Sequence, residues 1–183
     1  MKVPAAFIEP VRRIEGDARL DGAPGRALAA VARRAVPNRA AEDALLGTWL
    51  GHALHPLLTD FPLGMWMSAS LLDLAGGPDA RGPARRLVGL GLLAAVPTVA
   101  AGLAEWQRTS GPARRVGVVH AAVNATATGL YGSSWLARRR GRHRTGVALG
   151  IAGGLVATAG GYFGGHLTLV RKIGSAHPAF DPS

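Results

Sequence analysis

The chain has 183 residues, of which 48% are hydrophobic and only 17% charged, with a formal net charge of +10. Charged residues make up about a quarter of an ordinary soluble domain, so this composition is not typical of one. The absence of cysteine excludes disulfides, cysteine-ligated iron–sulfur clusters and covalently attached c-type haem. The arginines lie at the ends of apolar segments, as juxtamembrane charges do, and no nucleic-acid-binding motif is present. We therefore expect no nucleic-acid partner.

Residues 1–50 are predicted to form a basic N-terminal tail. The first 30 residues contain no continuous apolar run, so we expect no cleavable signal peptide. The pattern of residues 25–50 predicts one or two amphipathic helices that are interrupted near Pro37. Such a helix either lies on the membrane surface or belongs to a partly ordered tail, and the sequence leaves both alternatives open.

Four apolar segments follow the tail, at about residues 56–75, 87–105, 116–137 and 145–170. Each is close to the ~20 residues that a helix needs to cross a bilayer. They are rich in alanine and glycine, which membrane helices tolerate better than soluble helices do. In the first segment, Pro62 is expected to leave the carbonyl group near Leu58 free to accept another hydrogen bond.

The loops between these segments are short, so consecutive helices are expected to be antiparallel neighbours. The predicted fold class is therefore all-α: an integral membrane four-helix up-and-down bundle with an amphipathic, partly helical N-terminal tail. The predicted boundaries are 1–50 for the tail, 51–174 for the transmembrane domain and 175–183 for a short C-terminal tail.

The last apolar segment carries small residues at a spacing of four. These are Gly146, Gly150 and Gly154 on one helix face, and Gly153, Ala157, Gly161 and Gly165 on the neighbouring one. Small residues at this spacing allow helices to approach closely. We interpret them first as a packing surface, within the bundle or in a homo-oligomer. The alternative is that the missing side chains leave room for a flat cofactor.

Polar residues are expected to gather at one membrane face, because antiparallel threading brings alternate helix ends together. The residues expected there are His52, His55, Asp60, Glu105, His120, Asn124 and His166. Ionisable residues in membrane helices are functional candidates by default. The structural alternative is a hydrogen-bond network that holds the helix ends together.

The first functional interpretation of this polar cluster is a b-type haem, which takes two axial histidines from separate helices. His120 and His166 lie at matching distances from the arginines that bound their helices, so we expect them to be the ligands. His55 is a substitute for either, and Asn124 shares the helix face of His120. The predicted function is then electron transfer.

The second interpretation is a divalent metal site, because zinc and copper accept histidine and carboxylate ligands. The candidate ligands are His52, His55, Asp60, His120 and His166. A purely structural or interaction role of the same residues is the remaining alternative. The sequence contains no nucleophile beside a histidine, no HExxH motif and no phosphate-binding loop, which favours a protein that is not an enzyme.

Four motifs carry a resemblance to a known family. They are "GTWLGHALHPLLTDFPLGMWMSASLLDL" (47–74), "AGLAEW" (101–106), "HAAVN" (120–124) and "GGHLTLVRKIG" (164–174). Together they resemble the bacterial membrane family called domain of unknown function 2231, which shows a Gly-His-Pro-Leu-His-Pro run, an aspartate, a Pro-x-Gly and a tryptophan. Ala53 stands where the first proline is usual, and Glu105 stands where an aspartate is common. The resemblance runs from about Leu46 to Gly174.

The resemblance implies a four-helix integral domain that crosses the inner membrane of a bacterium several times, with the lipid bilayer as its surroundings. Some relatives carry a Rieske iron–sulfur or cytochrome c domain on the same chain, which favours a redox role. In this chain such a role implies a separate redox protein as partner. Arginines flank both ends of the predicted helices, so the sequence leaves the orientation in the membrane open.

Overall fold

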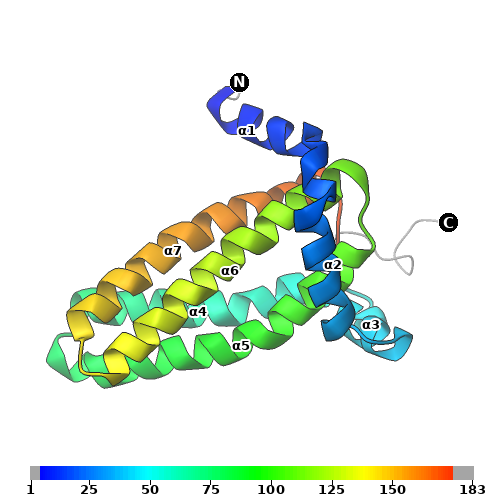
Figure 1. Cartoon of the computed structure of the whole chain (residues 1–183). Coiled ribbons are helices and arrows are strands. Elements are labelled where there is room, and N and C mark those ends of the chain that lie inside the picture. The colour runs from blue at the N-terminus through cyan, green and yellow to red at the C-terminus, as the bar shows by residue number, and fades with distance from the viewer. Residues whose placement is uncertain (1–4, 175–183) are drawn as a thin grey trace. The chain divides into compact units, whose positions relative to one another are not determined.

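The structure of the protein, a computed structural model, describes residues 5–174, and the regular structure in this range is helical throughout (Figure 1). Three shorter helices come first: α1 (Ala5–Gly16), α2 (Ala23–Ala35) and α3 (Arg39–Leu46). Four long helices follow: α4 (Leu54–Ala75), α5 (Arg81–Gln107), α6 (Gly111–Arg139) and α7 (His143–Gly165). The all-α prediction is confirmed. The predicted C-terminal tail, 175–183, lies outside the described residues.

Short helical turns connect or extend these helices. The 3-10 turns are η1 (Ala18–Asp21), η2 (Thr48–Leu50) and η3 (Pro78–Ala80), and the π-helical turn η4 (His166–Val170) continues α7. Asn38 precedes α3 as its N-cap, and its side chain accepts a hydrogen bond from the Ala41 N–H. Gly47 follows α3 as its C-cap, with a φ of +75° that favours glycine.

Two prolines lie in the interior of long helices, Pro62 in α4 and Pro97 in α5. Because Pro62 has no N–H, the carbonyl group of Leu58 lacks its usual helical donor. The Thr98 hydroxyl donates to this carbonyl oxygen over 3.1 Å. The prediction that the Leu58 carbonyl would accept another hydrogen bond is confirmed, and the bond joins α4 to α5.

The chain divides into two compact units, and each of the four long helices contributes to both. Unit 1 consists of residues 1–55, 100–122 and 161–183, and unit 2 consists of residues 56–99 and 123–160. In unit 1 the core contains Ala32 from α2 with Leu103, Trp106 and Val118 from α5 and α6. Helix α2 therefore uses its apolar face to pack on the protein, so the tail is an ordered helical layer over the described residues.

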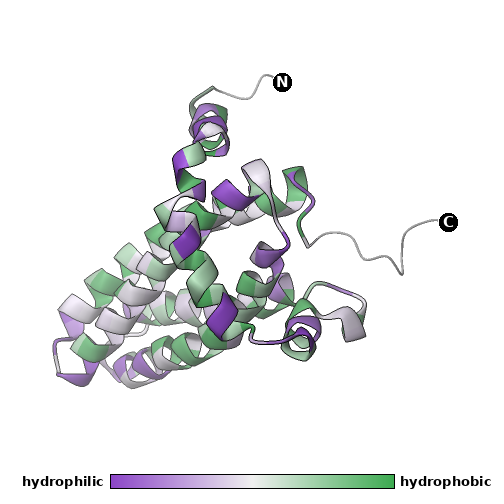
Figure 2. Cartoon of the chain, turned by 45° about the vertical axis from the view of Figure 1, so that its right-hand side comes forward, coloured by the Kyte–Doolittle hydropathy of each residue, from purple (hydrophilic) through white to green (hydrophobic). Residues whose placement is uncertain are grey.

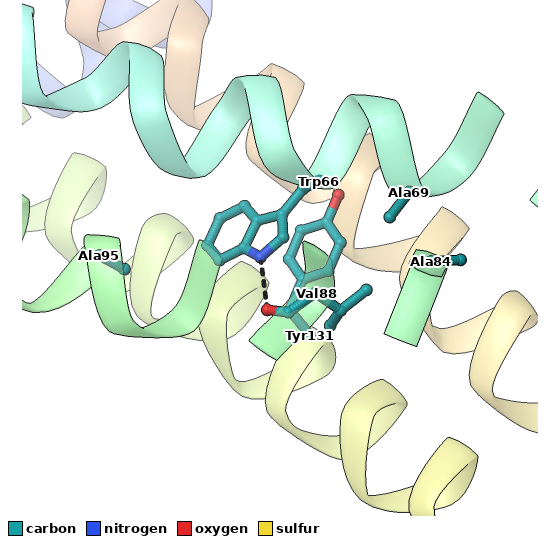
Figure 3. Packing of buried hydrophobic residues seen from close by; sticks show 6 residues of the cluster. All are labelled: Trp66, Ala69, Ala84, Val88, Ala95 and Tyr131. Atoms are coloured by element: carbon teal, nitrogen blue, oxygen red, sulfur yellow. Dashed lines mark hydrogen bonds between the residues drawn. The ribbon is translucent and has the colours of Figure 1, made fainter. Parts of the chain in front are cut away.

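The core of unit 2 is built around one tryptophan (Figure 3). The indole ring of Trp66 stacks on the Tyr131 ring, with the ring centroids 4.0 Å apart and the planes within 13° of parallel. Its Nε1–H donates to the Val88 carbonyl oxygen over 3.3 Å. Gly91 lies against the same indole, where a Cβ would come within 2.3 Å of Nε1. Helices α4, α5 and α6 thus meet at Trp66.

Two helical stretches among residues 5–174 are long and apolar enough to cross a membrane, Pro78–Gln107 and His143–Val170. These correspond to α5 and α7 with their flanking turns. Helices α4 and α6 do not meet this criterion, because α4 includes Asp60 and Asp73 and α6 is rich in small and polar residues. Figure 2 shows that hydrophobic residues run along the long helices and that hydrophilic ones gather at the loop between α6 and α7.

Candidate functional site

Two of the predicted site histidines lie side by side in unit 1. His55, in the first turn of α4, and His120, in α6, have ring centroids 6.4 Å apart and nearly perpendicular planes. A Cβ on Gly102 of α5 would come within 2.8 Å of His55 Cε1, and one on Gly164 of α7 within 3.1 Å of His120 Cε1. Each imidazole therefore packs on a glycine of a neighbouring helix. All four long helices contribute to the surroundings of this histidine pair, α5 and α7 through their glycines.

Glu105 lies one helical turn after Gly102 on α5. Its Oε1 atom is buried and has no hydrogen-bond partner among residues 5–174. The side chain is covered by the segment after α7, since a Cβ on Gly174 would come within 3.1 Å of both carboxyl oxygens. A buried carboxyl group therefore belongs to the same unit as the histidine pair.

His166 opens the π-helical turn η4 and bonds to the N-terminal tail. Its Nε2 atom is 2.7 Å from Oε1 of Glu15 in α1, and both side chains are mostly buried. Glu15 also accepts hydrogen bonds from Arg171, at 2.8 Å from Nε and 2.6 Å from the terminal nitrogen. The sequence paired His166 with His120 as haem ligands, but the structure shows its ring nitrogen bonded to Glu15. Sequence reasoning missed Glu15 because the tail was treated as a separate segment.

Ion pairs join the tail to the ends of three long helices within unit 1. Arg171 pairs with Glu15 and Arg115 with Asp21, with nitrogen–oxygen distances of 2.6 and 2.8 Å. Arg108 pairs with Glu42 at 2.8 Å and with Asp43 at 4.0 Å. Each carboxylate comes from the N-terminal residues, and each arginine lies at an end of α5, α6 or α7. No sequence motif marks these pairs, although the tail does carry acidic residues between its arginines.

The hydrogen bond from Arg171 lowers the pKa of Glu15 below its ordinary value; burial opposes this shift, and the hydrogen bond with His166 adds to it. A carboxyl group with a lowered pKa in the folded state stabilises that state above its ordinary pKa of about 4.3. This stabilisation is lost as the pH falls through the lowered pKa. The attachment of α1 is therefore expected to weaken in acid.

Acidification is expected to loosen α1, and Glu15→Gln is expected to loosen it already at neutral pH. The measurement is the distance distribution between spin labels at Arg12→Cys and Leu169→Cys, two exposed positions of unit 1 in a chain without native cysteine. The distribution should be narrow at pH 7 and broaden below about pH 4. The matched control is Glu9→Gln, which removes an exposed pairing with Arg13. Equal broadening in both variants would contradict the role of Glu15.

The remaining predicted ligands lie in different surroundings. His52 is exposed in the segment before α4, and Asp60 is exposed on the second turn of α4 in unit 2. Asn124 also belongs to unit 2, where its amide packs against Gly160 of α7. Within the described part of the chain, no group of three or more histidine, aspartate or glutamate side chains is arranged to hold a metal ion. The structure thus gives the divalent metal interpretation no support.

The glycines of α7 test whether a flat cofactor fits beside the histidines. Four of these glycines face side chains of α6. A Cβ on Gly146 would come within 2.5 Å of Arg138, and one on Gly153 within 3.1 Å of Tyr131. A Cβ on Gly160 would come within 2.7 Å of Asn124, and one on Gly164 within 3.1 Å of His120. At these four glycines the space that the missing side chain leaves is filled by α6, whereas a Cβ at Gly161 or Gly165 would meet nothing within 4 Å. Gly146, Gly153, Gly160 and Gly164 therefore pack α7 against α6, as in the first interpretation.

Unit 2 contains a buried ion pair that the sequence did not indicate. Arg138, near the end of α6, donates to both carboxylate oxygens of Asp73 in α4 over 2.7 and 2.5 Å. The side chains are only 2% and 4% exposed. Ser134 accepts a hydrogen bond from Arg138 Nε and donates to the Gly146 carbonyl oxygen of α7. The polar interior of unit 2 thus joins α4, α6 and α7.

Long apolar helices, small residues at their contacts and charges paired in the interior together define a helical membrane protein. The comparison with known families agrees with this class. The chain belongs to the family described as predicted membrane protein (DUF2231), whose model matches residues 51–177. The resemblance predicted from the four motifs is confirmed. No curated protein and no solved structure matches the chain.

Proposed function

We propose that the chain is a multi-pass protein of a bacterial inner membrane in which α4, α5, α6 and α7 all cross the bilayer. The polar residues of unit 1 then act as a structural element that holds the helix ends and the N-terminal layer together. An inner-membrane location is supported by the helical fold, since outer-membrane spans are usually β-barrels. This proposal takes the structural alternative of the sequence analysis in place of a cofactor site.

The observation that best supports four crossings is the set of ion pairs in unit 1. Arg108 follows α5, Arg115 lies in the first turns of α6 and Arg171 follows α7, and all three bond to carboxylates of the N-terminal tail. The tail, the α5–α6 loop and the end of α7 are thus on one side of the membrane. Because α5 and α7 are apolar enough to cross, α4 and α6 must cross in the opposite direction to bring the chain back.

The outer surface of the long helices supports the same arrangement. Large apolar side chains of α4 are exposed although this helix also contains two aspartates: Leu57, Phe61, Met67, Leu71 and Leu74. Other helices expose Leu93, Val96 and Leu155, each by more than 65%. In water such a surface would be costly, since contiguous apolar patches of this kind mark interaction or membrane surfaces. Facing lipid chains, it is favourable.

Accessibility of single introduced cysteines tests the four crossings, and the natural chain supplies the cysteine-free background. The positions are Asp79 before α5, Ser110 between α5 and α6, and Arg142 between α6 and α7, all exposed. We expect a membrane-impermeant maleimide to label residues 79 and 142 from one side only. Residue 110 and Arg39 of the tail should be labelled from the other side only.

The arrangement of labels also separates the alternatives. If only α5 and α7 crossed, residue 142 would be labelled with residue 110, and Arg39 would be labelled with residue 79. Either pattern would refute the four-helix proposal. A cysteine at the exposed Leu155 serves as the matched internal control. It should be unreactive in membranes from both sides and become reactive in denaturing detergent.

Haem b, a separate redox partner and a homo-oligomer through α7 remain predictions of the sequence. The absorption spectrum of the purified protein, oxidised and then reduced with dithionite, tests the first of these. The structural role of the histidine pair predicts no Soret band after expression with ample haem. A Soret band that is lost in His120→Ala and kept in His143→Ala would overturn the structural role and restore the redox function.

A further inference from the structure

The loop end of unit 2 carries a concentration of exposed arginines. Arg81, Arg85 and Arg86 lie in the first turns of α5, and Arg139, Arg140, Arg142 and Arg144 lie at the turn from α6 to α7. The contacts between Trp135 and Gly89 and between Ser134 and Gly146 show that the end of α6 lies beside the starts of α5 and α7. The start of α5 and the turn from α6 to α7 lie at the same end of the long helices (Figure 1). The seven arginines of these segments are here called the arginine end.

The charge of the arginine end is not neutralised within the protein. Asp79 is the one exposed acidic residue beside it, while Asp73 is buried and bonded to Arg138. Among residues 5–174, none of the seven exposed arginines forms an ion pair with a carboxylate, whereas Arg108, Arg115 and Arg171 of unit 1 all do. The arginine end is thus open to an anionic partner.

Exposed leucines continue the same helix faces from these arginines. On α5, Arg86 is followed at i+4 by Leu90 and then by Leu93, both exposed. On α6, the exposed Leu136 precedes Arg140 by four residues. The guanidinium group of Arg139 lies 4.8 Å over the Trp135 ring, and tryptophan and arginine are residues typical of the membrane–water interface. Arg86, Arg139 and Arg140 thus each have an apolar side chain next to them on their own helix.

We propose that the arginine end binds the phosphate groups of anionic phospholipids, with the acyl chains lying along the leucine faces of α5 and α6. A cation above an apolar helix face complements both parts of a phospholipid, whereas inorganic phosphate would use the cations alone. Basic clusters at the ends of transmembrane helices attract anionic lipids in general. The proposal rests on the membrane crossing of α5 and α6 proposed above.

Lipid titration of the detergent-purified full chain tests this proposal. Binding of phosphatidylglycerol and of phosphatidylethanolamine with identical acyl chains is measured by native mass spectrometry. We expect a preference for phosphatidylglycerol that falls with added salt. The variant Arg85→Gln/Arg86→Gln/Arg140→Gln should weaken phosphatidylglycerol binding by about tenfold or more. The matched control, Arg26→Gln/Arg33→Gln/Arg34→Gln on α2, removes the same charge from exposed positions and should bind as the unaltered protein does.

Three outcomes would overturn the proposal: equal binding of the two lipids, equal losses in both triple variants, or full competition by millimolar inorganic phosphate. The triple lysine variant Arg85→Lys/Arg86→Lys/Arg140→Lys keeps the charge and should retain binding, which guards against a folding defect in the glutamine variant. The titration is made in detergent, so its result does not depend on the cysteine labelling. A failure of the four crossings and a failure of the lipid site are therefore distinguishable.

Discussion

Replacing Arg138 with methionine is expected to destabilise unit 2 by about 3–5 kcal/mol, the usual cost of leaving one member of a buried ion pair unpaired. The carboxylate of Asp73 would remain at 4% exposure without its two charged hydrogen bonds. Ser134 would also lose the hydrogen bond from the guanidinium Nε. The measurement is thermal unfolding of the detergent-purified protein, followed by helical circular dichroism.

The neighbouring arginine provides the matched control for this result. Arg139 is exposed and lies over the Trp135 ring, so Arg139→Met should cost no more than about 1 kcal/mol. The double variant Asp73→Leu/Arg138→Met removes both charges and should recover most of the lost stability, since apolar replacements of buried ion pairs are often neutral. If Arg138→Met and Arg139→Met proved equally stable, the buried pair would not hold α4 and α6 together.

Alanine at Gly91 is expected to destabilise the protein by about 1–3 kcal/mol through overpacking. The added Cβ would lie 2.3 Å from Trp66 Nε1 and 2.6 Å from Cδ1, so the indole must move. That movement disturbs both the stacking on Tyr131 and the hydrogen bond to the Val88 carbonyl oxygen. Thermal unfolding measures the loss, and a shift in tryptophan fluorescence reports the displaced ring.

Gly129→Ala is the control variant, for which we expect the stability to stay the same or rise rather than fall. Gly129 lies in the interior of α6, and a Cβ there would meet nothing within 4 Å. Alanine favours a helix over glycine by about 1 kcal/mol, so this variant should be as stable as the unaltered protein or more stable. A gain of stability in Gly91→Ala would show that Trp66 does not determine the approach of α4 and α5.

The fold was predictable where local rules decide it. Apolar segments of membrane length mark α5 and α7, and the missing N–H of Pro62 indicates the free carbonyl group that Thr98 fills. The convergence of His55 and His120 follows from antiparallel threading alone. These inferences need only the spacing of residues along one helix and the short loops between helices.

The attachment of the tail was not predictable, because it depends on pairs far apart in the sequence. Glu15 and Arg171 are separated by 156 residues, and nothing local marks one as the partner of the other. The same applies to Arg138 and Asp73, which looked like ordinary charges near helix ends. The contacts of Asn124 with Gly160 and of His120 with Gly164 also could not be read from the spacing of glycines in α7, since Gly161 and Gly165 of the same helix face open space.

The separation of Glu15 from its partners has a consequence for biosynthesis. Glu15 of α1 is synthesised well before its partners, since His166 and Arg171 lie 151 and 156 residues further along the chain. At about 5–20 residues per second, Glu15 waits on the order of ten seconds or more before its arginine exists. During that time α1 lacks the hydrogen bonds of Glu15 with His166 and Arg171. Completion of α7 and η4 is therefore the event that attaches α1.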